Sequence, residues 1–164
     1  MFSFFKIKKH GLCLSKGFSL VEIIITLGIL AIVSAIVLSS LSSNAGREAL
    51  AKNTDASASV LTEARSLTIS SKNASNYGVH LASTGPTLFT GTTYTAGAPS
   101  NRPLTLNARV SITNISLAGG GSDVVFSKLT GSTSQNGTFR VTLIADSSVY
   151  KTVTIYRTGL VEGQ

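Results

Sequence analysis

The sequence contains no tryptophan, one cysteine, two histidines and only seven acidic residues among its 164. A single thiol, Cys13, excludes an intramolecular disulfide and a cysteine metal cluster. His80 is the only histidine beyond His10, and no second histidine or dense carboxylate cluster accompanies it. A metal site or a nucleophile–base pair needs such partners, so the sequence predicts no enzyme, no cofactor and no metal. Gly119-Gly120-Gly121-Ser122 lacks the lysine of a phosphate-binding loop and is interpreted as a link between strands.

Positive charge is concentrated at the start of the chain. The net charge is +7, and four lysines lie within the first 17 residues: Lys6, Lys8, Lys9 and Lys16. From Phe18 onward, ten basic residues stand against seven acidic ones, which leaves +3. Lysines that precede an apolar helix favour a cytoplasmic N-terminus, so we expect the chain after about Leu41 to be exported.

The 24 residues from Phe18 to Leu41 contain one charged side chain, Glu22. At 1.5 Å per residue this run is long enough to cross a hydrocarbon core of about 30 Å. Cleavage by an ordinary signal peptidase, which would leave a start at Gly46, is the alternative. Its apolar region would be shorter, however, and Ser43-Asn44-Ala45 is a poor cleavage site.

The N-terminal features follow one another in a specific order. A short basic leader comes first, then Gly17, then Phe18, and then an apolar helix with Glu22 at its fifth position. This order resembles the class III signal of type IV prepilins and type II secretion pseudopilins. The resemblance implies that prepilin peptidase cuts between Gly17 and Phe18 on the cytoplasmic side and N-methylates Phe18. Cleavage turns the Phe18 nitrogen into an ammonium, and Glu22 is then expected to pair with it, within one helix or in a neighbouring subunit. A carboxylate that simply reaches the headgroups is the alternative for Glu22.

A helical pattern continues beyond the apolar run. Small and apolar residues recur at spacings near three, four and seven, which predicts one weakly apolar helix face. These residues are Ala45, Ala49, Leu50, Ser57, Leu61, Ala64, Leu67 and Thr68. We interpret Glu63 and Arg65 as solvated surface charges. The expected segments are a leader at 1–17, a membrane and filament-core helix at 18–41, and a helix continuation at 42–72.

The remaining residues, 73–164, form short β-branched or alternating runs between Gly, Pro, Ser and Asn clusters, which predicts antiparallel strands. The expected strands are Tyr77–Ala82, Thr87–Thr93, Arg109–Leu117, Asp123–Ser127, Thr138–Ala145 and Val149–Arg157. Gln135–Thr138 and Asp146–Ser148 are predicted turns, and 84–103 is predicted to be largely a long loop region. The predicted fold class is α+β, with a long N-terminal helix packed on an antiparallel sheet.

The C-terminal portion carries a second resemblance, to the GspH/FimT group of minor pilins. Its elements here are Phe126, Gly131, Phe139–Leu143, Val153–Tyr156 and Gly159-Leu160-Val161. A generic β-hairpin is the alternative interpretation of this stretch.

Together the resemblances imply a minor pilin or pseudopilin that primes, caps or inserts into a type II secretion pseudopilus or type IV pilus. The implied partners are prepilin peptidase, other pilins or pseudopilins, and an inner-membrane assembly platform. The implied location is the bacterial inner membrane, single-pass, with the domain in the periplasm or in an extracellular filament. The alternative is a pilin-like binding module for DNA or a surface. Its candidate residues are Arg102, Arg109, Lys128, Arg140, Lys151 and Arg157, with Phe139, Tyr150 and Tyr156 nearby. We favour the structural role because a charge of +3 is typical of a solvated surface.

Overall fold

A computed structural model of the chain describes residues 17–70 and 74–164, in its helix without the side chains of residues 38–43. The expectations for residues 1–16, which include the leader lysines and Cys13, and for the segment boundary at 72 and 73 lie outside the described residues. The chain divides into two compact units, Met1–Ser40 and Leu41–Gln164.

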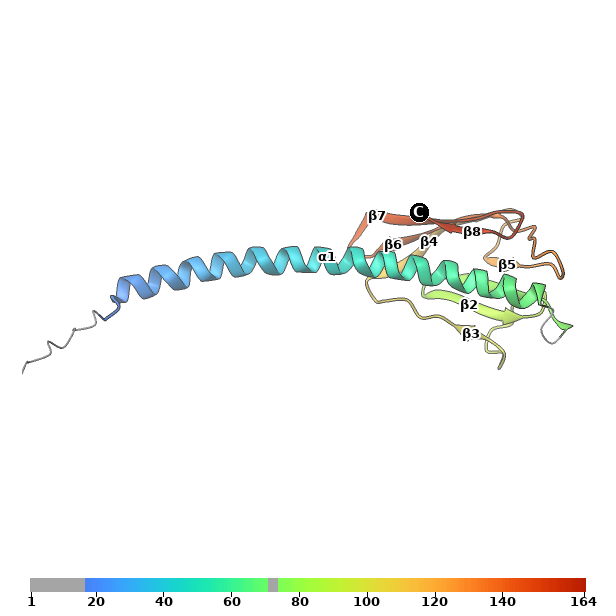
Figure 1. The fold of residues 1–164 in the computed structure, drawn as a ribbon, viewed down its shortest axis with the longest axis horizontal. Helices are drawn as coiled ribbons and strands as arrows, with labels where there is room; N and C mark the ends of the chain where they lie inside the picture. The colour runs from blue at the N-terminus through green and yellow to red at the C-terminus, as the bar shows by residue number, and fades with distance from the viewer. Residues whose placement is uncertain (1–16, 71–73) are drawn as a thin grey trace, which may run out of the picture. The chain divides into compact units, whose positions relative to one another are not determined.

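One helix, α1, runs from Leu20 to Ile69 (Figure 1). Its 50 residues include no proline and only two glycines, Gly28 and Gly46, so little in the sequence opposes helix formation. A continuous helix is therefore present where the sequence pattern predicted one. Within the C-terminal unit, the predicted face is the buried one: Leu50, Leu61 and Ala64 belong to the hydrophobic core. Ser57 and Thr68 are also fully buried on that face.

In the described residues, eight strands follow the helix and form two antiparallel sheets rather than the single sheet that the sequence predicted. Sheet A has the order β3-β2-β1-β5, and sheet B has the order β4-β6-β7-β8. The strands of sheet A are β1 Tyr77–Ala82, β2 Gly85–Thr90, β3 Arg102–Pro103 and β5 Asp123–Val125. Those of sheet B are β4 Val110–Leu117, β6 Gly137–Leu143, β7 Asp146–Ile155 and β8 Val161–Gly163.

Three local predictions need correction. The region 84–103 is not one long loop, because β2 and β3 lie within it and only 91–101 connects them. The turn predicted at Asp146–Ser148 instead lies at residues 144–145, because Leu143 pairs with Asp146. Gln135–Thr138 does not close a tight hairpin. It ends an irregular connection after β5, in which Asn136 accepts a backbone bond from Ala118.

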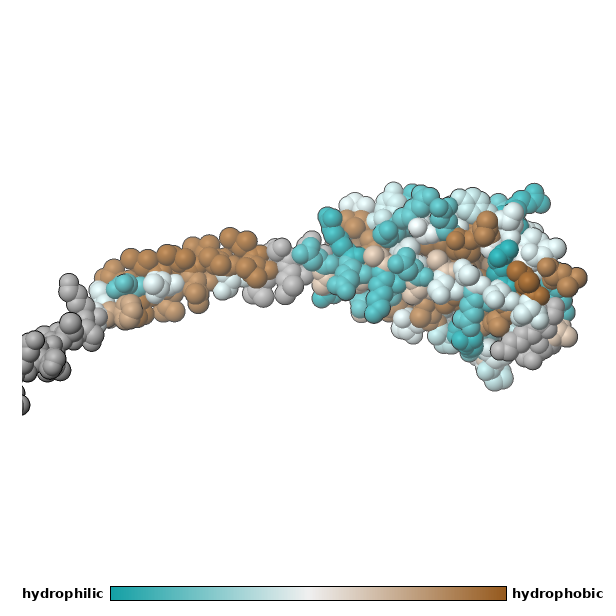
Figure 2. Space-filling model, viewed as in Figure 1, coloured by the Kyte–Doolittle hydropathy of each residue, from teal (hydrophilic) through white to brown (hydrophobic). Residues whose placement is uncertain are grey.

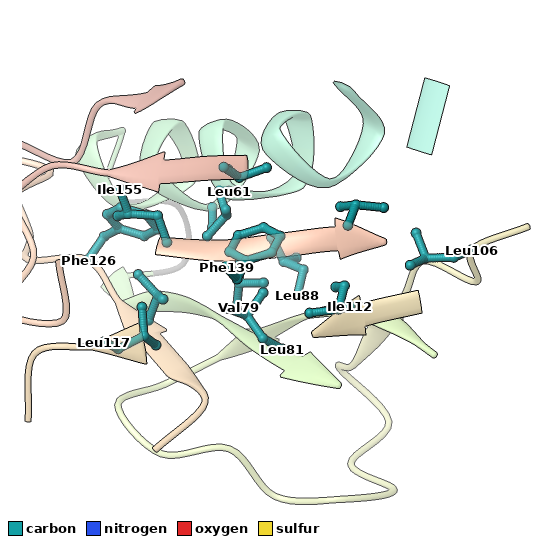
Figure 3. Packing of buried hydrophobic residues seen from close by; sticks show 14 of the residues in the cluster. Leu61, Val79, Leu81, Leu88, Leu106, Ile112, Leu117, Phe126, Phe139 and Ile155 are labelled. Carbon is teal, nitrogen blue, oxygen red and sulfur yellow. The ribbon is translucent and has the colours of Figure 1, made fainter. Parts of the chain in front are cut away.

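The core lies where α1 meets the inner faces of both sheets. Leu61 from α1, Val79 from β1 and Phe139 from β6 are each fully buried and point toward one another (Figure 3). Val124 from β5 and Val153 from β7 belong to the same cluster. Strand alternation explains which strand residues are buried, because every second residue of a strand faces the same side of its sheet. One shared core therefore holds the helix and both sheets together in the C-terminal unit.

Two polar side chains on α1 also contact the strand domain. Arg102 Nη1 of β3 donates to Glu63 Oε1 over 2.6 Å. Arg65 Nε donates to the carbonyl oxygen of Gly131 over 3.3 Å. The Glu63–Arg102 pair is exposed, with 42% and 63% of the two side chains accessible, which agrees with the interpretation of Glu63 as a surface charge. Arg65, in contrast, is half-buried against the strand domain. The partners of Glu63 and Arg65 are 39 and 66 residues away in the chain, so no local pattern in the sequence revealed them.

Candidate functional site: the N-terminal segment and the domain it carries

The residues singled out for processing precede and begin α1. Gly17 and Phe18 lie before the first helical residue, Leu20, so the bond between them belongs to non-helical backbone. Phe18 is 80% exposed, and no atom of the described residues lies within 4 Å of the position where a Cβ on Gly17 would stand. Within the part of the chain that the structure describes, nothing therefore covers the predicted cleavage site.

Glu22 is the acidic residue of the first turn of α1, and its side chain is exposed. It lies in a strongly apolar part of the helix: the window Leu20–Val37 has a mean hydropathy of 2.7, and none of it is buried. The hydroxyls in this segment are satisfied locally, because Thr26 donates to the carbonyl of Ile23 and Ser34 to that of Leu30. The brown surface in Figure 2 shows this apolar segment. By length and composition the helix is able to cross a membrane.

The six basic residues of the binding-module alternative do not lie together. Arg102 is bound to Glu63, and Lys128 Nζ donates to the carbonyl of Ala74. Arg140 lies over the ring of Tyr150, 4.1 Å from its centroid. The other three are distributed over sheet B: Arg109 precedes β4, Lys151 is next to Tyr150 but on the opposite face of β7, and Arg157 follows β7. Only Arg140 is stacked on an aromatic ring, so the described residues carry no basic patch that includes all six.

A small aromatic cluster, which sequence reasoning missed, lies on the outer face of sheet A. His80 stacks on Tyr94 with ring centroids 4.0 Å apart and an angle of 3° between the planes. Tyr94 meets Phe89 edge-on at 5.6 Å, and Phe89 covers Gly78. His80 Nδ1 hydrogen-bonds Asp123 Oδ1 over 2.6 Å. The cluster holds the 91–101 connection against the sheet, so His80 has a packing role there.

The outer face of sheet B carries an open groove of about 760 Å³. Thr138, Thr154, Tyr156, Leu160 and Glu162 are among its lining residues. The Tyr156 hydroxyl donates to Glu162 Oε2 over 3.0 Å, and this bond to the carboxylate raises the pKa of the Tyr156 phenol. Within residues 17–70 and 74–164, no group of three or more His, Cys, Asp or Glu side chains is placed to hold a metal ion.

Comparison with known proteins finds similarities to the N-terminal segment and to the fold. The family model of the prokaryotic N-terminal methylation motif matches residues 14–38, which include Gly17, Phe18 and Glu22. Two crystal structures of the type IV minor pilin FimU from Pseudomonas aeruginosa are similar in fold. The first is 14% identical with a TM-score of 0.55, and the match covers 72% of this chain and 90% of that chain. The second is 13% identical with a TM-score of 0.51, covering 70% and 92%. No curated protein matches the sequence.

The chain therefore has the prokaryotic N-terminal methylation motif and an α+β fold similar to that of a type IV minor pilin. The motif begins before α1 and includes its apolar first part, and the fold similarity covers 72% of the chain. This confirms the predicted resemblance and the predicted fold class.

Proposed function

We propose that this chain is a minor pilin or pseudopilin, a structural subunit that primes, caps or inserts into a type IV pilus or type II secretion pseudopilus. The observation that carries the proposal is the combination of the methylation motif at 14–38 with a pilin-like domain on the same helix. A plain membrane anchor needs neither a methylation motif nor a carboxylate in the first turn of its span.

In this proposal residues 1–17 are the leader, 18–41 the membrane and filament-core helix, 42–72 its continuation and 73–164 the exported domain. Prepilin peptidase cuts between Gly17 and Phe18 and methylates Phe18. The mature chain is held in the inner membrane by a single span with its N-terminus cytoplasmic. An assembly platform then transfers it into a filament with other pilin-like subunits.

Glu22 has a chemical reason to be in the span. The new ammonium at Phe18 and the Glu22 carboxylate are separated by about one helical turn along the chain, and opposite charges at about 4 Å attract by several kcal/mol at an intermediate dielectric. Pairing with the Phe18 ammonium of a neighbouring subunit sets the axial register between the two. Pairing offsets the cost of placing the carboxylate near lipid.

Processing is tested by the intact mass of the membrane-extracted chain. The expected mature protein begins at Phe18 and is heavier by one methyl group. Gly17→Leu is expected to retain residues 1–17, whereas Gly28→Leu, a matched change in the span where no atom lies within 4 Å of the added Cβ, is expected to be processed normally. A chain that begins at Gly46 would show ordinary signal cleavage and contradict the proposal.

A further inference from the structure

The start of α1 has the residues that a helix uses to cap its own first turn. The first helical residue is Leu20, at the blue end of the ribbon in Figure 1. The amide of Ile23 donates to the carbonyl oxygen of Ser19 over 3.2 Å, and this bond opens the helical series. The residue whose carbonyl accepts that bond while it lies just outside the helix is the N-cap, so Ser19 is the N-cap of α1. Glu22 is then the third helical residue.

A serine at the N-cap with a glutamate three positions later is a capping box, and Ser19 and Glu22 have this spacing. In a closed capping box, the serine hydroxyl accepts a hydrogen bond from the amide of the glutamate. The carboxylate in turn accepts a hydrogen bond from the amide of the serine. Both amides belong to the first turn, where no carbonyl of the helix is available to them. The box therefore supplies partners that the helix itself cannot.

The apolar residues beside the box agree with a capped helix start. In many capped helices the residue before the N-cap packs on the fourth helical residue. These positions are occupied by Phe18 and Ile23, which are both large and apolar. Ile23 is 46% exposed, the lowest value among the large apolar residues from Phe18 to Val37. The sequence therefore has the apolar pair of a capped helix start as well as the polar pair.

The surroundings of the helix start decide whether the box closes. Ser19 and Glu22 are both exposed, and their two reciprocal side-chain bonds are not formed among the described residues of this structure. At an exposed helix end, water can satisfy the same amides and the same carboxylate. Lipid offers no such replacement, and an unpaired polar group there is costly. Closure of the box is therefore favoured where the apolar part of α1 lies in a membrane.

We propose that Ser19 caps α1 in the membrane and holds the Glu22 carboxylate at the helix start, where the Phe18 ammonium arises. The inference rests on the proposed function and makes Ser19 a positioning residue for assembly. Before cleavage the Phe18 nitrogen is a neutral amide, so the Ser19 amide is the partner that offsets the cost of the carboxylate. After cleavage one carboxylate oxygen keeps the Ser19 amide, and the other accepts from the ammonium of a Phe18.

Amide hydrogen exchange in phospholipid bicelles tests the cap before any filament forms. The full chain is prepared in a host without prepilin peptidase, so that residues 1–17 remain. In Ser19→Ala we expect the Glu22 amide to exchange roughly fivefold faster, because its acceptor is lost, and in Ser19→Thr to keep the slow rate. Ser34→Ala is the matched control, because the Ser34 hydroxyl donates to the carbonyl of Leu30 within its own helix. Equal rates at Glu22 in Ser19→Ala and Ser34→Ala would overturn the cap.

Substitutions of Glu22 test the other half of the box in the same preparation. Glutamine can accept from the Ser19 amide as glutamate does, whereas alanine has no acceptor. We therefore expect the Ser19 amide to keep its slow exchange in Glu22→Gln and to exchange roughly fivefold faster in Glu22→Ala. The same exchange rate at Ser19 in both variants would contradict the bond from its amide to the carboxylate.

Recovery in sheared filaments separates the cap from the filament role. Glu22→Gln keeps the cap but removes the charge, so its recovery should fall as sharply as that of Glu22→Ala, and Ser19→Ala should lose less. If exchange follows the expected pattern but recovery does not depend on the charge at Glu22, the cap is supported and the filament role of the carboxylate is wrong. If recovery depends on Glu22 but exchange at the helix start is the same in all variants, the cap is wrong and the filament role stands.

Discussion

Gly159 lies directly against the carbonyl oxygen of Gly131, and both residues pack on Arg65 of α1. The two glycines have φ values of +76° and +63°, which side-chain-bearing residues rarely adopt. Through this contact the loop after β7 and the loop before β6 meet the C-terminal part of the helix. The two glycines of the GspH/FimT-like pattern thus lie together in the fold.

Gly159→Ala is expected to destabilise the domain by more than the left-handed conformation alone explains. That conformation costs about 1–2 kcal/mol, and the added Cβ also meets backbone that cannot move away cheaply. Gly97→Ala is the matched control, because Gly97 has a φ of +75° and open space around it. Thermal unfolding of the detergent-solubilised chain, followed by its β-sheet signal, compares the two. Equal losses of stability would mean that the packing against Gly131 contributes nothing.

Tyr94→Ala is expected to release the 91–101 connection without loosening the main core. The substitution removes the stack on His80 and the edge contact with Phe89, and aromatic pairs of this kind contribute about 0.5–1.5 kcal/mol each beyond burial. Amide hydrogen exchange should therefore accelerate at residues 91–101 while β6 and β7 keep their protection. Tyr150→Ala, which removes an exposed ring that contacts Arg140, is the control and should leave 91–101 unchanged. Exchange that accelerates everywhere would show that Tyr94 supports the whole domain.

The sequence predicted most elements and missed how they combine. Periodicity identified the buried face of α1 and the residues of most strands, because these patterns are local. The division into two sheets depends on pairings such as Val79 with Val124, which are 45 positions apart. Strands β3 and β8 have two and three residues, too short for any alternation to appear. The Glu63–Arg102 pair follows from the same long-range packing and left no pattern along the chain.

The residues singled out for function also divide into those that the sequence could predict and those that it could not. Gly17, Phe18 and Glu22 form a contiguous motif, so the sequence alone was enough to single them out. The aromatic cluster of His80, Tyr94 and Phe89 could not be found by pattern, because its three rings come from separate segments of the chain. Their stacking exists only in the folded chain.

Asp146 should titrate below its ordinary range because the Ser148 hydroxyl and amide donate to its carboxylate over 2.6 and 3.0 Å. A lowered pKa in the folded state means that this interaction favours folding above the pKa of the unfolded chain. The contribution is lost as the pH falls through the pKa of the folded state. In Ser148→Ala the pKa of Asp146 should rise, as measured by NMR titration of its side-chain carboxyl. Ser147→Ala, one position away, should leave that pKa where it is. A pKa that does not move in Ser148→Ala would show that the hydroxyl does not stabilise the carboxylate.

Glu22→Ala separates a filament subunit from a simple membrane anchor. For an anchor, the loss of a carboxylate from the first turn of an apolar helix leaves insertion intact or slightly better. For a filament subunit, the change leaves the Phe18 ammonium without its partner in a poorly hydrated environment, where losing one member of a charge pair costs about 3–5 kcal/mol. Cleavage should proceed, because it depends on Gly17, and the exported domain should keep its fold. Recovery in sheared filaments should then fall sharply at equal protein level. Thr26→Ala, one turn further along the same helix, removes a hydroxyl that is bonded within its own helix, so it should assemble normally. Equal recovery of wild type and Glu22→Ala would leave the carboxylate without a role in assembly.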